Sequence, residues 1–153
     1  PDYNHSYDSS NISIHSYLEK YPEIQIVLDV HRDTVITSSK TKYRAVAEIN
    51  GETSSQVMIL LGSGREKYPN SHWEENLKFS LMIQKTAAER YPGLMRPILL
   101  RNYLYNQDIT PGSILVEVGT CGNTPEEAER GAGYFAECLI EVLDVINEKG
   151  ALR

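Results

Sequence analysis

Residues 25–33 read QIVLDVHRD, and the middle of this stretch is apolar except for one acid. The run Ile26–Val30, interrupted only by Asp29, predicts a β-strand that is buried on both faces. It ends abruptly in three polar residues, of which the first is His31. Because ligands of open α/β sheets bind beyond the carboxyl ends of the strands, His31 is a candidate metal ligand or general base.

Helical patterns flank this strand on both sides. The first helix carries an apolar face, ends at Pro22 and has Ser9 or Ser10 as its expected cap. A long second helix is predicted over residues 72–91. The final helix has the clearest start, with a cap, a first-turn proline and a capping-box glutamate at Thr124, Pro125 and Glu127.

Four further segments read as strands: residues 43–49, 57–61, 97–100 and 114–118. The first two are expected to form a hairpin across Asn50 and Gly51. The last is a second strand buried on both faces, and the acid Glu117 interrupts it. This alternation predicts one α/β domain over residues 1–153, a three-layer sandwich whose mixed, mostly parallel sheet is flanked by helices.

The charge balance argues against binding to nucleic acid or to an anionic membrane surface. The chain has 15 basic and 21 acidic residues and no basic cluster. No apolar run reaches transmembrane length. Cys121 and Cys138 would lie ~20 Å apart along the final helix, so the sequence predicts two free thiols.

Glu117 needs a partner, because an unpaired carboxylate at a buried position costs several kcal/mol. One alternative is a structural salt bridge to Arg32, Arg101 or Arg130. The other is a catalytic base beside a metal-bound water. For His31 the alternatives are a hydrogen-bonded structural residue or a metal ligand whose imidazole is oriented by a neighbouring acid, Asp29 or Asp33.

Other motifs carry less information. Asn106 and Gln107, in a loop between two strands, could hydrogen-bond a peptide substrate or simply close a turn. The triplet His31–Asp33 also occurs in protein kinases, but the asparagine that must follow five positions later is Ser38 here. The Gly62-Ser63-Gly64 segment lacks the remainder of a nucleotide-binding motif and is interpreted as a turn.

Seen together, these segments resemble the catalytic domain of the stage II sporulation protein P family. The resemblance extends over almost the whole chain, and its motifs are specific through their order and spacing. They are residues 3–10, LDVHRD at 28–33, LLGS at 60–63, WEENLKF at 73–79, YNQD at 105–108, LVEVG at 115–119 and NTPEEA at 123–128. The last two are also similar to the wider family of N-acetylmuramoyl-L-alanine amidases.

The resemblance implies a zinc-dependent peptidoglycan hydrolase that acts during engulfment in sporulation. Its reaction would be hydrolysis of the amide between N-acetylmuramic acid and L-alanine of the stem peptide, with cleavage of peptide cross-links as an additional activity. By the match, His31 would be a zinc ligand and Glu117 the catalytic acid/base. Arg32, Asp33 and Asn106 are candidates for contacts with the substrate or around the metal ligands.

In this family the first strand and the remaining zinc ligands are expected upstream of Pro1. The chain alone is therefore expected to hold zinc poorly, to be inactive and to associate through an open sheet edge. The resemblance further implies an extracytoplasmic protein with an upstream membrane anchor and a glycan-cleaving sporulation partner. Two alternatives stay open: a non-catalytic module that binds cell wall or a partner, and another metal hydrolase such as a peptidase.

Overall fold

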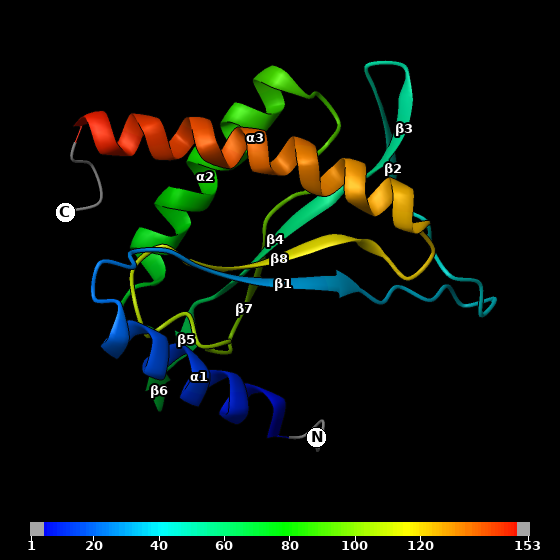
Figure 1. The fold of residues 1–153 in the computed structure, drawn as a ribbon. Coiled ribbons are helices and arrows are strands. Elements are labelled where there is room, and N and C mark those ends of the chain that lie inside the picture. Colours follow the sequence, from blue (N-terminus) through cyan, green and yellow to red (C-terminus); the bar gives the residue numbers. More distant parts are fainter. Residues whose placement is uncertain (1–4, 150–153) are drawn as a thin grey trace.

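The computed structural model describes residues 5–149, which form three long helices and eight strands (Figure 1). The first motif of the resemblance, residues 3–10, therefore begins outside the described residues. The elements in chain order are α1 (Ser6–Lys20), β1 (Val27–Asp33), β2 (Val46–Ile49), β3 (Glu52–Ser55), β4 (Val57–Gly62), β5 (Gly64–Arg65), β6 (Tyr68–Pro69), α2 (Trp73–Arg90), β7 (Leu99–Arg101), β8 (Ser113–Thr120) and α3 (Pro125–Lys149).

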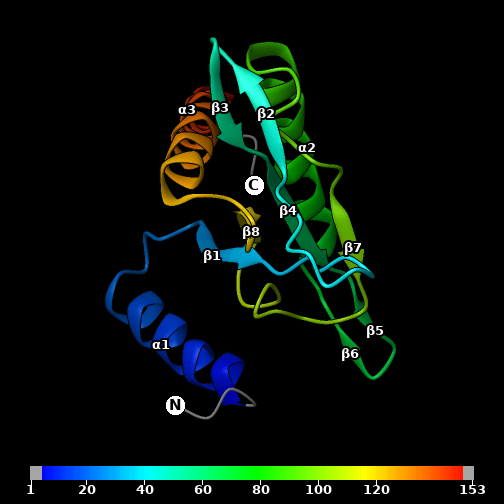
Figure 2. The same cartoon turned by 90° about the vertical axis from the view of Figure 1, so that its right-hand side faces the viewer.

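The central sheet has the strand order β1-β8-β4-β7. β1 runs parallel to β8, β8 antiparallel to β4, and β4 parallel to β7. Helices lie on both sides of this sheet, with α1 on the opposite side from α3 in both views (Figures 1 and 2). The predicted α/β fold with a mixed, mostly parallel sheet flanked by helices is confirmed.

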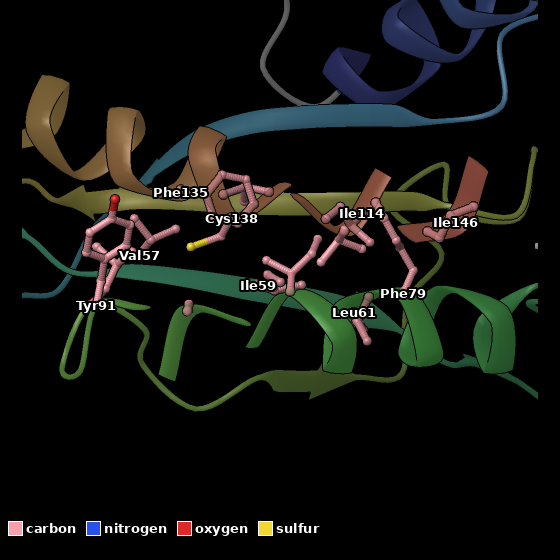
Figure 3. Packing of buried hydrophobic residues seen from close by; sticks show 14 of the residues in the cluster. Val57, Ile59, Leu61, Phe79, Tyr91, Ile114, Phe135, Cys138 and Ile146 are labelled. Atoms are coloured by element: carbon pink, nitrogen blue, oxygen red, sulfur yellow. The ribbon is translucent and has the colours of Figure 1, made fainter. Parts of the chain in front are cut away.

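The hydrophobic core lies between the sheet and the helices α2 and α3 (Figure 3). Alternate side chains of β4 and β8 point into it, as the period of two in a strand requires. Its central members are Ile59, Leu61, Phe79, Ile83, Ile114, Val116, Phe135, Cys138 and Val142. The side chains between them, such as Glu117, consequently face the other side of the sheet.

The hairpin prediction was half right. Asn50 and Gly51 form the turn, both with positive φ, but the second strand is β3 rather than Val57–Leu61. A two-residue turn pairs the residues next to it, so the polar segment Glu52–Ser55 is drawn into the hairpin. The apolar run instead forms β4 in the centre of the main sheet, where all six residues are buried.

β1 is an edge strand, so the prediction of burial on both faces was wrong for it. Within the described residues it pairs only with β8, and Val30 is 65% exposed. The inner residues Val27 and Leu28 are half-buried, and together with Ile14 and Leu18 of α1 they line a hollow between the helix and the strand. An apolar run indicates a strand but does not distinguish a central strand from an edge.

The helix ends agree with the sequence in one case and differ in another. At α3, the Thr124 amide donates to Glu127 at 3.1 Å and the Glu127 amide donates to Thr124 Oγ1 at 3.3 Å, so the capping box is confirmed. α1 begins at Ser6, earlier than a cap at Ser9 or Ser10 would allow. Both cysteines are free thiols, as predicted.

Candidate functional site

His31 and Glu117 are neighbours across the parallel pair β1–β8, because the register places their Cα atoms opposite each other. Asp29 lies two residues before His31 on the same face of β1. Its Oδ1 is 2.9 Å from His31 Nε2, so Asp29 is the acid that orients the imidazole. The ring of Tyr7, from α1, stacks on His31 with 6.4 Å between the ring centroids.

Glu117 lines a cavity of about 600 Å³. The carboxylate is buried, and among residues 5–149 its Oε2 atom accepts no hydrogen bond. Burial raises the pKa of the Glu117 carboxyl, and the nearby acid Asp33 raises it further. An acid of this kind is held closer to its protonated form, which suits a group that exchanges protons with a substrate.

No arginine pairs with Glu117 in the part of the chain that the structure describes. Arg32 donates through Nε to Thr120 O at 2.9 Å and through its other end to Asn123 O. Arg130 donates to Thr53 O at 2.7 Å. The salt-bridge explanation of the acid is therefore wrong. Arg32 thus joins the end of β1 to the end of β8 and to the turn before α3.

Asp33 lies in the cavity and forms an ion pair with Arg96, whose Nη1 is 2.8 Å from Asp33 Oδ2. The backbone of Arg96 is fixed by a hydrogen bond of its amide to Val57 O at 2.8 Å. Arg96 thus brings a positive charge into the same hollow as the unpaired Glu117. Nothing in the sequence pointed to Arg96, because it precedes a short strand and reaches the site only through the fold.

Asn106 contacts α1 instead of the cavity. Its side chain accepts a hydrogen bond from Asn11 at 3.0 Å and donates to Tyr7 O and Ser10 Oγ, each at 3.0 Å. Asn106 and its neighbour Tyr105 both have positive φ, a conformation that non-glycine residues adopt rarely. This tight turn points Tyr105 into the cavity while Asn106 holds the helix.

Gln107 closes the loop and is only 2% exposed. It accepts from the Gly62 amide and donates to Leu60 O, each at 2.9 Å. Asn76, in α2, adds a hydrogen bond to Gln107 O at 2.8 Å. Of the two roles considered for Gln107, the structure shows the turn-closing one, and Asn76 is a buried partner that the sequence analysis missed.

Tyr105 also lines the cavity, and the sequence analysis noted it only as part of the YNQD motif, without a role. Burial raises the pKa of its hydroxyl, and the neighbouring Arg101 works in the opposite direction. Its ring contacts Tyr7 at 5.7 Å and Tyr103 at 5.9 Å between centroids. The site is therefore bordered by an aromatic series that runs from α1 to the end of β7.

A zinc site in the described residues requires His, Cys, Asp or Glu side chains, because zinc prefers these as ligands. His31 and the unpaired Glu117 are the donor types that zinc chemistry uses, yet within residues 5–149 no three His, Cys, Asp or Glu side chains converge to hold a metal ion. A complete site would require ligands beyond those that the structure shows. The described residues therefore fit one ligand and one acid/base, and they do not fit a closed metal centre.

These features define an α/β domain with a polar site on the sheet face that α2 and α3 leave uncovered. The family description "Stage II sporulation protein P (SpoIIP)" matches residues 1–140, and the chain belongs to this family. It is 30% identical over 146 residues to the stage II sporulation protein P of Bacillus subtilis (strain 168).

The alignment covers 92% of this chain but 34% of that relative, so the chain spans about a third of the relative's length. No solved structure gives a significant match. Among the helices of the described residues, none is both long and apolar enough to cross a membrane.

Proposed function

We propose that this domain is a peptidoglycan hydrolase that cleaves the amide between N-acetylmuramic acid and L-alanine during engulfment in sporulation. The observation that carries the proposal is Glu117, a buried carboxylate whose Oε2 has no hydrogen-bond partner among the described residues. It lines a cavity of about 600 Å³ and lies opposite His31 on the neighbouring strand. A buried, unpaired acid in a cavity is costly for folding, so a chemical role is the simplest reason for it.

The residues of this chain divide the work between positioning and proton transfer. Glu117 accepts a proton from the attacking water and returns it to the leaving amine of L-alanine. His31 serves as one zinc ligand, and Asp29, 2.9 Å away, holds its ring in place. Zinc, when bound, polarises a scissile carbonyl and lowers the pKa of water. The further ligands are proposed to come from sequence upstream of Pro1.

Because the chain belongs to this family, we also propose where the protein acts and with which kind of partner. We expect a protein that acts outside the cytoplasmic membrane, held there by an upstream anchor, together with a partner that cleaves the glycan strand. Cleavage of peptide cross-links is proposed as a second activity, because the same proton-transfer chemistry hydrolyses any suitably placed amide.

One observation favours a different function. Because no three ligands converge in the described part of the chain, the domain could keep the fold and bind cell wall or a partner without catalysis. In that case Glu117 and His31 would contribute to a binding surface, and their removal would weaken adhesion to the wall without changing any product.

The test is digestion of purified peptidoglycan in the presence of zinc. The full-length protein and the 153-residue chain are compared, and released fragments are identified by mass spectrometry. We expect the full-length protein to release intact stem peptides that begin with L-alanine, and Glu117→Gln to abolish this release. Glu23→Gln, on the exposed turn after α1, is the matched control and should stay active.

Three outcomes separate the candidates. Release of stem peptides by the full-length protein alone supports the amidase and a need for upstream ligands. Fragments cut only within the peptide would replace the amidase with a peptidase. Binding of both proteins to the wall without any product would favour the non-catalytic module.

A further inference from the structure

Two further hollows lie beside the Glu117 cavity, between the end of β7 and the β5–β6 hairpin. The cavity shares Arg101 and Tyr103 with a second hollow of about 410 Å³, which in turn shares Arg65 and Tyr103 with a third of about 170 Å³. Hollows that share lining residues are neighbours, so the three lie along one stretch of the surface. We call its outer part the arginine groove, defined by Arg65, Tyr68, Arg101, Asn102 and Tyr103.

The arginine groove is positive in a chain whose net charge is −6. No acidic side chain lines its two hollows. Within the described residues neither Arg65 nor Arg101 forms a salt bridge, whereas Arg44, Arg90 and Arg96 each have an acidic partner. Two guanidinium groups without a carboxylate partner, in a groove that starts at the proposed active site, are suited to anionic ligands.

Aromatic contacts and backbone packing hold the groove in shape. The Arg65 guanidinium lies over the rings of Tyr68 and Tyr103, at 5.4 and 5.8 Å from the centroids. The Ser63 amide donates to Arg101 O at 2.9 Å. At Gly62, an added Cβ would lie 2.1 Å from Tyr103 O, so only glycine permits this approach. The Gly62-Ser63-Gly64 segment, first interpreted as a turn, thus packs against Arg101 and Tyr103 and leads directly into Arg65 of β5.

We propose that the arginine groove binds the peptide portion of the substrate through its carboxylates. This inference rests on the proposed function, because it takes the bond at Glu117 to be the one between muramic acid and L-alanine. On that bond the leaving group is the peptide, which bears free carboxylates a few residues beyond the alanine nitrogen. Arg101, which also lines the Glu117 cavity, would meet the nearer carboxylate and Arg65 the farther one.

Direct binding of a soluble peptide tests this without any catalysis or metal. L-Ala-γ-D-Glu-L-Lys is titrated into the 153-residue chain by calorimetry, beside the same peptide with both carboxyl groups amidated. A charge-assisted hydrogen bond is worth ~1.5 kcal/mol, so Arg101→Gln and Arg65→Gln should each raise Kd about tenfold. Lys78→Gln removes an equal charge from the exposed face of α2, away from the groove, and should leave Kd unchanged.

We expect the amidated peptide to bind at least tenfold more weakly than the acid and to be insensitive to both arginine variants. Equal binding of the two peptides, no measurable binding of the acid, or equal effects of Lys78→Gln and Arg101→Gln would each overturn the proposal. Circular dichroism confirms that the variants are folded. Binding as expected by a protein that cleaves no wall would refute the amidase but not the groove. Amidase activity without peptide binding would refute the groove alone.

Discussion

The Glu117 carboxylate lowers the stability of the folded chain. Its carboxylate is buried and its Oε2 has no hydrogen-bond partner in residues 5–149. We expect Glu117→Gln to stabilise the chain by about 1 kcal/mol at neutral pH, because the amide removes a buried charge. Thermal melting of the two proteins measures the effect. The control variant is Glu23→Gln, at an exposed site, which should change stability by less than about 0.5 kcal/mol. If Glu117→Gln instead lowers stability, the carboxylate has a structural partner.

The pKa of the Glu127 carboxyl is lowered, whereas that of Glu117 is raised. Hydrogen bonds from Arg44, Asn123 and the Thr124 amide lower the pKa of its carboxyl to about 2 from the usual 4.5. A lowered pKa stabilises the fold above pH 4.5, and this contribution is lost as the pH falls from about 4.5 to about 2. Glu127→Gln should therefore cost about 2 kcal/mol at pH 7, and the difference from wild type should shrink toward pH 2.

Urea denaturation at a series of pH values checks this prediction. Ser13→Ala, which removes an exposed hydroxyl that donates to the backbone carbonyl of Ser9, serves as a control whose small effect involves no carboxylate and should not follow this pH window. A difference between wild type and Glu127→Gln that stays constant down to pH 2 would contradict the assignment.

Two glycines of α3 offer a comparison within one helix. A Cβ at Gly131 would lie 2.4 Å from Ser55 Oγ and 2.7 Å from Ser55 O, so β3 would have to move. A Cβ at Gly133 meets nothing within 4 Å. We expect Gly131→Ala to destabilise the chain by about 2 kcal/mol and Gly133→Ala to stabilise it by about 1 kcal/mol. Chemical denaturation of both variants measures these two changes in the free energy of unfolding. Stabilisation by Gly131→Ala would show that β3 is not held against the helix.

The elements were largely predictable, and the exceptions have local reasons. The capping box of α3 and the buried runs of β4 and β8 depend only on residues that are close together in the sequence, so they could be predicted. The partner of β2 was missed because Glu52–Ser55 is polar and joins a strand only through the turn before it. The exposure of β1 was missed because it depends on which strand lies beside it, and the neighbour β8 is far away in sequence.

Some residues of the site were predictable from the sequence and others were not. His31 and Glu117 stand out because each is a polar group within or beside an apolar strand, and the register confirms that they are neighbours. Arg96 and Arg65 carry no signal in the sequence, Tyr105 appeared only within the YNQD motif, and Arg101 was considered only as a salt-bridge partner of Glu117. They reach the site from separate loops and strand ends, and only the packed sheet brings them to one face.

The open edge of the sheet should govern association between copies of the chain. In the described residues β1 has no partner on its outer side, and it exposes Val30. Exposed apolar edge strands pair with other chains, so we expect the 153-residue chain to associate as its concentration rises. Val30→Lys should keep it monomeric, because a charged residue on an edge strand blocks such pairing.

Sedimentation velocity over a range of concentrations measures this association. Ile140→Lys is the matched control, because Ile140 is equally apolar and 58% exposed but lies on α3 rather than on the edge. Monomers at every concentration of the wild-type chain would contradict the prediction. An equal effect of both lysines would point to general hydrophobic association instead of strand pairing.

The pairing of β1 with β8 also has a consequence for the order in which the protein is made. β1 ends at Asp33, yet the strand it pairs with begins at Ser113. Contacts between such distant segments form late, because a long loop must close first. During translation β1 emerges before β8 and lacks this partner until the elements between them have been synthesised. The segment that carries His31 is therefore among the last to reach its folded position. Until β8 is available, its apolar residues stay exposed and must be kept from aggregating.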